Sequence, residues 1–207
     1  MPRPRLHATE DLLDAAATLA AEHGPGKVTM AAVAAATGAP SGTLYHRFGN
    51  RAGLLAAVWL RTVTAFQDGY FTALEREPVL EALVAAARHV VAWSREHPRD
   101  LRILLRGPAE FELATAPADV RARVEAAQQR LEDAFRSTAT RLPGDPADAR
   151  DVVVLVTVDL PYAVARRHLR AGAIPDAVDV LLERSVRAIV ADWIGGPVSR
   201  RGDLETS

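Results

Sequence analysis

The stretch that decides the fold is residues 29–48, Thr-Met-Ala-Ala-Val-Ala-Ala-Ala-Thr-Gly-Ala-Pro-Ser-Gly-Thr-Leu-Tyr-His-Arg-Phe. It reads as two short helices, from Thr29 to Thr37 and from Ser41 to Phe48. Gly38 lies between them and can adopt the left-handed backbone that a tight turn between two helices requires.

Three residues in this stretch have the spacing of a helix-turn-helix. Ala34 is small, as the crossing point of two helices requires, Gly38 makes the turn, and Leu44 supplies an apolar anchor from the second helix. The pattern therefore predicts that residues 41–48 form a recognition helix in the major groove of DNA. A plain helical hairpin in a bundle is the alternative, but such a hairpin has no need of the sequence Gly-Thr-Leu-Tyr-His-Arg-Phe.

The side chains of this second helix suit contact with DNA. Gly42 allows a backbone to come close, and the hydroxyl and methyl groups of Thr43 suit a base edge and a thymine methyl. Tyr45 and His46 offer hydrogen-bond donors to phosphates. Ser41 suits either a helix cap or a phosphate donor. Arg51 opens the next helix, whose N-terminal amides also favour a phosphate.

The pattern from Val28 to Leu55 resembles the DNA-binding signature of the TetR (tetracycline-repressor-like) family. The resemblance covers about residues 9–55 and rests above all on Gly42-Thr43-Leu44-Tyr45 followed by Phe48. It implies a three-helix DNA-binding domain, an all-α ligand-binding domain, a homodimer, and release from a palindromic operator when a small molecule binds. It also adds Thr29, at the start of the second helix, to the expected DNA contacts.

Two departures from the family pattern bear on the expected contacts. Pro40 and Ser41 stand where the family more often has Ser-Lys, which removes one positive charge. Arg51 stands where the family usually has lysine, so a phosphate contact is still possible but would come from a guanidinium, which is broader than an ammonium.

The rest of the chain predicts an all-α fold without strands. Helical periodicity or capping signals predict further helices at 9–23, 50–71, 79–96, 100–105, 118–141, 147–170 and 175–194. We expect a helix-turn-helix domain over 1–50, a helical-bundle ligand-binding and dimerisation domain over 51–197, and a flexible tail over 198–207. Pro2 to Arg5 could form an arm that reaches DNA or a disordered leader.

Composition excludes several classes of protein. The 207 residues carry a net charge of -1, which excludes a protein that binds nucleic acid through a uniformly basic surface. They contain no cysteine, which excludes disulfide scaffolds and thiolate metal sites. No apolar run is long enough for a membrane helix, so we expect a soluble, cytoplasmic protein with no membrane partner. No catalytic motif is found, and the pair His89 and His97 is a weak basis for a metal site. We expect no enzyme activity, metal or cofactor.

Aromatic residues beyond the motif suggest a small-molecule pocket in the second domain. Each one is individually as much a core residue as a pocket residue, but a cavity lined by such side chains is the usual form of a ligand site. Asp159 follows an apolar run and precedes Pro161, which should kink its helix. A salt bridge, for example to Arg166, or a polar anchor in the pocket would each explain it. The predicted ligand-binding residues are Phe66, Tyr70, Trp93, Phe111, Asp159 and Tyr162.

The last helix carries apolar residues at helical spacing, among them Val178, Leu181, Leu182 and Trp193. It could close the monomer core or form a four-helix interface with a second copy, and the family resemblance favours the homodimer through the last two helices. The sequence therefore predicts a ligand-responsive transcriptional regulator, most simply a repressor, with a double-stranded DNA operator and an apolar or aromatic effector as partners. The alternatives are an all-α binding or interaction module with a vestigial helix-turn-helix, and an all-α enzyme using Asp159 and a histidine.

Overall fold

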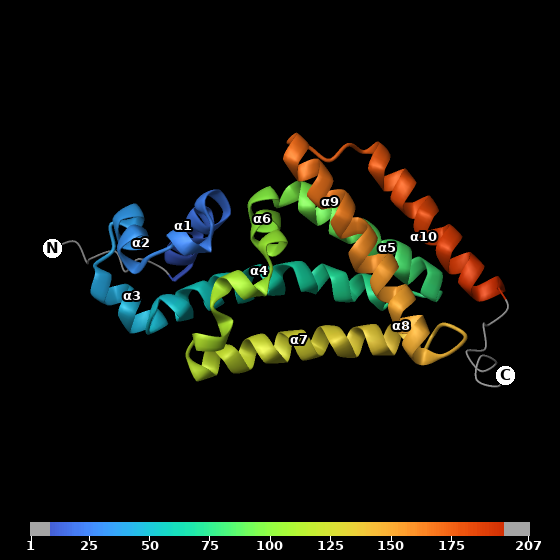
Figure 1. Cartoon of the computed structure of the whole chain (residues 1–207), viewed down its shortest axis with the longest axis horizontal. Coiled ribbons are helices and arrows are strands. Elements are labelled where there is room, and N and C mark those ends of the chain that lie inside the picture. Colours follow the sequence, from blue (N-terminus) through green and yellow to red (C-terminus); the bar gives the residue numbers. More distant parts are fainter. Residues whose placement is uncertain (1–8, 197–207) are drawn as a thin grey trace, which may run out of the picture. The chain divides into compact units, whose positions relative to one another are not determined.

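The computed structural model describes residues 9–196, and all its regular elements are helical (Figure 1). No strand occurs within this described range, as the sequence predicts. The expected tail at 198–207 and the expected arm at 2–5 lie outside the described residues. The α-helices are α1 (Thr9–His23), α2 (Met30–Thr37), α3 (Ser41–Phe48), α4 (Arg51–Leu74), α5 (Val79–Glu96), α6 (Pro98–Arg106), α7 (Ala118–Ala139), α8 (Pro146–Val154), α9 (Leu160–Ala171) and α10 (Ala177–Gly195).

Short turns of other helical types join some of these helices. The 3-10 turns are η1 (Pro25–Lys27), η2 (Pro108–Phe111) and η3 (Leu113–Thr115), and a π-helical turn, η4 (Leu155–Asp159), joins α8 to α9. The predicted helix at 147–170 is therefore interrupted. Pro161 lacks an N–H group and cannot continue an α-helical ladder, so the expected kink takes the form of this π turn.

Contacts divide the chain into two compact units. Unit 1 contains the described residues 9–68 and 96–130, and unit 2 contains 69–95 and 131–196. This division by compactness differs from the boundary expected after residue 50, because α6 packs on α1 and the residues after α6 share the core of unit 1. The expected boundaries stay a prediction about function.

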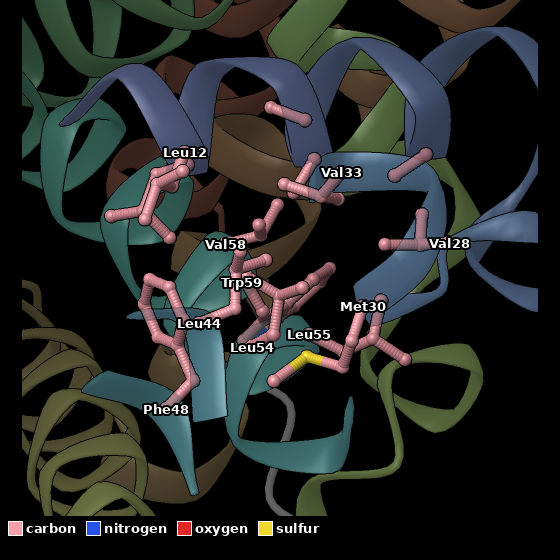
Figure 2. Close-up of a cluster of buried hydrophobic side chains, with 14 of the residues drawn as sticks. Leu12, Val28, Met30, Val33, Leu44, Phe48, Leu54, Leu55, Val58 and Trp59 are labelled. Carbon is pink, nitrogen blue, oxygen red and sulfur yellow. The ribbon is translucent and has the colours of Figure 1, made fainter. Parts of the chain in front are cut away.

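The core of unit 1 is a cluster of aliphatic and aromatic side chains beneath the helix-turn-helix (Figure 2). Leu12 of α1, Val33 of α2 and Leu44 of α3 are fully buried in it. Leu54 and Leu55 of α4 are fully buried as well. Burial of a leucine of this kind contributes about 1.5–3 kcal/mol, so these anchors hold three helices that are too short to be stable alone.

Unit 2 is a set of helices held by an apolar core and by ion pairs between α5 and α10. Val178, Leu182, Val186 and Val190 form the buried stripe of α10, at spacings of four residues. Near this stripe, the carboxylates of α10 and α5 pair with arginines of the other helix. The pairs are Arg88 with Glu183, Arg95 with Asp179, and Arg187 with Glu81.

Candidate nucleic-acid interface

The turn between α2 and α3 has the geometry that the sequence predicts. Gly38 ends α2 with φ 68° and ψ 13°, in the left-handed region that favours glycine. Thr29 caps the start of α2, where its Oγ1 accepts a hydrogen bond from the amide of Ala32 at 3.0 Å. The start of α3 is closed by a bond from the amide of Thr43 to the carbonyl of Pro40 at 2.9 Å.

Helix α3 buries one face and leaves the other open. Leu44 and Phe48 point into the core, whereas Tyr45 and His46 lie on the exposed face, with Tyr45 55% exposed. Ser41 and Gly42 are exposed at the start of the helix, and Thr43 is half-buried at its edge. The structure thus gathers the predicted contacts of α3 on one short helix, with exposed Thr29 at the start of the preceding one.

The stretch of sequence around α3 carries basic residues and no acidic ones. No acidic residue occurs between Glu22 and Asp68, a stretch that holds Lys27, Arg47, Arg51 and Arg61. Arg51 and Arg61 are paired with acidic residues from outside this stretch, Arg51 with Glu112 and Arg61 with Glu10 and Asp14. Lys27 and Arg47 form no ion pair with a described residue.

Two arginines near α3 have partners inside unit 1. Arg47 donates to Thr9 Oγ1 at 2.9 Å. Arg51 donates from Nε to the carbonyl of Val28 at 2.6 Å and from Nη2 to the carbonyl of Pro25 at 2.7 Å, and its Nη1 pairs with Glu112. The sequence analysis missed Glu112, because it lies 61 residues from Arg51 and no local pattern marks it.

The residues predicted for the ligand pocket fall into both units. Phe66 and Phe111 belong to unit 1, and the other four belong to unit 2. Phe111 is 0% exposed and packs against Trp59 with ring centroids 5.1 Å apart, inside the core beneath the helix-turn-helix. Phe111 therefore contributes to the core of unit 1.

In unit 2, Tyr70 forms a buried polar contact with the π turn. Its hydroxyl donates to Thr157 Oγ1 at 2.7 Å, and Thr157 donates in turn to the carbonyl of Val153 at 2.7 Å. Burial raises the pKa of Tyr70 well above its ordinary value, so the phenol stays neutral and serves as a donor. Trp93 is also buried, and Tyr162 is half-buried.

Asp159 is exposed, so its carboxylate carries no burial cost. It lines an open surface groove with Asp148, Asp151 and Trp193, among others, and it forms no ion pair with Arg166 or any other described residue. The salt bridge to Arg166 that the sequence suggested is therefore not formed, and the polar anchor in a ligand pocket stays a prediction.

Across the described residues, no group of three or more histidine or acidic side chains is placed to hold a metal ion. No described helix is both long and apolar enough to cross a bilayer.

A fold of helices alone, with a short exposed helix on a helix-turn-helix and basic surroundings, defines a DNA-binding protein of the helix-turn-helix class. Residues 12–58 match the family model described as "Bacterial regulatory proteins, tetR family". Residues 12–58 are therefore similar to the N-terminal DNA-binding domain of this family. No curated protein sequence matched the chain.

Solved structures of TetR-family regulators share the fold over nearly the whole chain. A TetR-like regulator from a Rhodococcus species aligns with 18% identity and a TM-score of 0.66, covering 95% of this chain and 100% of that one. PfmR from Thermus thermophilus aligns with 20% identity and a TM-score of 0.61, covering 92% and 97%. FadR from Bacillus subtilis, solved in complex with stearoyl-CoA, aligns with 14% identity and a TM-score of 0.63, covering 92% and 100%.

Proposed function

We propose that this protein is a ligand-responsive repressor that binds a palindromic operator as a homodimer. The observation that carries the proposal is the division of α3 into a buried face and an exposed face of residues that suit DNA. Tyr45 is the clearest member, because a large aromatic side chain that is 55% exposed on a short helix has no evident role in the fold. Thr29, Ser41, Gly42, Thr43 and His46 are the other contacts that we assign to this surface.

The dimer follows from the exposed apolar residues of unit 2. Apart from Tyr45, the large hydrophobic side chains that are exposed in the described range lie on the π turn and on α10: Leu155, Val180, Leu181 and Ile194. One face of α10 is already buried against its own unit, so a second copy is the partner that a two-fold helical interface predicts. Two recognition helices would then read half-sites about one helical turn apart.

The effector that we propose is a small, largely apolar or aromatic molecule bound in the C-terminal part of the chain. Buried Tyr70 and Trp93 and half-buried Tyr162 offer apolar area with a few polar atoms, as ligand sites do. The FadR neighbour was solved with a molecule that carries a long apolar chain, which agrees with an apolar effector. The effector would act only to the extent that it binds one head spacing better than the other. Such a regulator would work in the cytoplasm and would have no catalytic activity.

Fluorescence anisotropy tests the proposal directly. The protein would be titrated into duplexes from the intergenic DNA that flanks its own gene, and into random duplexes of equal length, across a salt series. Specific binding with a steep salt dependence supports the proposal, because phosphate neutralisation gives a slope of about -0.9 per contact. Equal, weak binding to both kinds of duplex at these and all other tested regulatory regions would instead indicate a binding module whose helix-turn-helix is vestigial.

A further inference from the structure

The guanidinium of Arg51 joins three separate segments of unit 1. Its Nε and Nη2 donate to the carbonyls of Val28 and Pro25, at the turn between α1 and α2, and its Nη1 pairs with Glu112. Arg51 itself is the first residue of α4, directly after the recognition helix. The side chain thus fixes the junction between α3 and α4 to the turn between α1 and α2 and to Glu112.

Glu112 belongs to a segment that is docked on the helix-turn-helix core. We name residues 107–117, between α6 and α7, the connector. Its Phe111 is fully buried against Trp59, and η2 of the connector contacts η1. Glu112 has φ 52°, a conformation that non-glycine residues rarely adopt, and it is fixed by bonds to its carbonyl from the amide and the hydroxyl of Thr115, both at 3.0 Å. The carboxylate is therefore held in place toward Arg51.

The chemistry of arginine explains why this residue can make such a contact. A guanidinium presents its donors as a rigid planar fork, so three nitrogens can meet three acceptors that lie in different directions. A lysine ammonium is a single point of charge and cannot reproduce this pattern. Pairing with Glu112 also neutralises the charge that a phosphate would attract.

We propose that Arg51 is a positioning residue for the recognition helix and not a phosphate ligand, and that Glu112 makes its position depend on the connector. This inference rests on the proposed function, because it concerns how α3 is presented to DNA. It replaces the phosphate contact that the sequence suggested for Arg51. It also predicts that a displacement of the connector changes DNA binding without touching the DNA surface.

The test uses the full chain and four variants: Arg51→Lys, Arg51→Gln, Glu112→Gln and the double variant Arg51→Lys/Glu112→Gln. Arg102→Lys is the matched control, because Arg102 is exposed on α6 and keeps its charge in the same substitution. Each protein is titrated by anisotropy into the operator duplex and a random duplex of equal length, from about 50 to 200 mM salt. Melting temperatures are measured in parallel.

If the proposal holds, Arg51→Lys and Glu112→Gln each weaken operator binding about tenfold at fixed salt, the scale of one lost charge-assisted hydrogen bond. The salt slope stays at the wild-type value in these variants and in Arg51→Gln. The double variant is no weaker than either single variant, since both remove the same link. Arg102→Lys binds as the wild type does.

Three results would overturn the proposal. A phosphate ligand would show full affinity in Arg51→Lys and a salt slope about 0.9 smaller in Arg51→Gln. A merely structural role would lower the melting temperature but leave operator affinity unchanged in the folded protein. Additive losses in the double variant would show that Glu112 does not act through Arg51. If no duplex binds the wild type specifically, the proposed function fails, and non-additive melting temperatures would then separately show whether the link exists.

Discussion

Gly42 is a glycine that the packing of the protein does not require. It is the second residue of α3, in the first turn of the helix, and a Cβ added there would meet no atom within 4 Å. A glycine inside a helix costs about 0.5–1 kcal/mol relative to alanine, so packing alone gives no reason for it. Under the proposed function, the reason is close approach of the DNA backbone to the exposed side of α3.

Gly42→Ala should therefore stabilise the protein and weaken its binding to DNA. We expect the free energy of unfolding to rise by about 0.5–1 kcal/mol and operator affinity to fall by about tenfold or more, because the new methyl group holds the backbone away from DNA. Urea unfolding and anisotropy measure the two effects. Gly38→Ala is the control. Its φ of 68° makes alanine unfavourable by about 1–2 kcal/mol. The free energy of unfolding of this variant should therefore fall, whereas that of Gly42→Ala should rise. A Gly42→Ala variant with unchanged affinity would contradict the assignment.

Thr43 and Tyr45 provide a second test at the level of side chains. Thr43→Ala and Tyr45→Phe remove hydroxyl groups at the edge and on the exposed face of α3. We expect each to lower operator affinity by about 1 kcal/mol, near fivefold, and to change the free energy of unfolding by less than about 0.5 kcal/mol. Anisotropy on operator and random duplexes measures the loss, which should be larger on the operator for Thr43→Ala. Equal affinities for the variants and the wild type would show that α3 does not read DNA through these groups.

Among the elements, α10 combines a buried stripe with exposed apolar residues. Its buried stripe and its ion pairs with α5 hold it in unit 2, whereas Val180 and Leu181 lie outside this stripe and are 56% and 62% exposed. The sequence pattern had joined Val178, Leu181, Leu182 and Trp193 in a single apolar set. The structure separates this set, because neighbouring positions 181 and 182 point to different sides of a helix.

The ion pair between α5 and α10 predicts how stability depends on pH. Arg187 binds Glu81 through two bonds, Nη1 to Oε1 at 2.6 Å and Nη2 to Oε2 at 3.0 Å. These hydrogen bonds hold the pKa of Glu81 below its usual range. A carboxyl whose pKa is lower in the folded state contributes stability above its unfolded pKa, about 4.3, and loses it as pH falls through the folded pKa.

Between about pH 5 and pH 3, the melting temperature of Glu81→Gln should therefore fall less than that of the wild type. At pH 7 the variant should be the less stable protein, because Arg187 keeps its charge but loses this partner. Glu75→Gln is the control, because Glu75 is exposed and forms no ion pair with a described residue. Parallel curves for the Glu81→Gln variant and the wild type would rule out this linkage.

For the whole molecule, the exposed apolar residues of α10 and of the π turn predict assembly into a dimer. Leu181→Asp should raise the dissociation constant of a homodimer about 100-fold or more, since two-fold symmetry places two carboxylates in one apolar interface. Light scattering on a size-exclusion column would then report a monomer where the wild type forms a dimer. Binding to a palindromic operator should weaken with it, whereas binding to random DNA changes little.

Ala126→Asp is the control for this prediction, because it places the same charge at an exposed position of α7. Its oligomeric state should match that of the wild type. A Leu181→Asp protein that remains dimeric would show that α10 does not form the interface, and the exposed residues of the π turn would then need another explanation.

The sequence alone determined the helix-turn-helix and its exposed residues. The bounds of α3 and α5 agree with the prediction, because these features depend on residues within one or two turns. The last helix was predicted to start at Pro175 but begins at Ala177, after a turn in which the amide of Val178 bonds to Pro175. Periodicity and capping residues predict that a helix exists more accurately than they predict its first residue.

Only the tertiary structure decided the partners of Arg51, the place of Phe111 and the exposed side of α10. Arg51 meets the carbonyl of Val28, 23 residues away, and the carboxylate of Glu112, 61 residues away. The second contact depends on how the connector packs on the core of unit 1. Phe111 reads as a pocket residue in the sequence, yet it fills the core beside Trp59. The physical reason is the same in each case. Periodicity and capping act along one helix, whereas the partner of a side chain is set by which distant segments pack beside it.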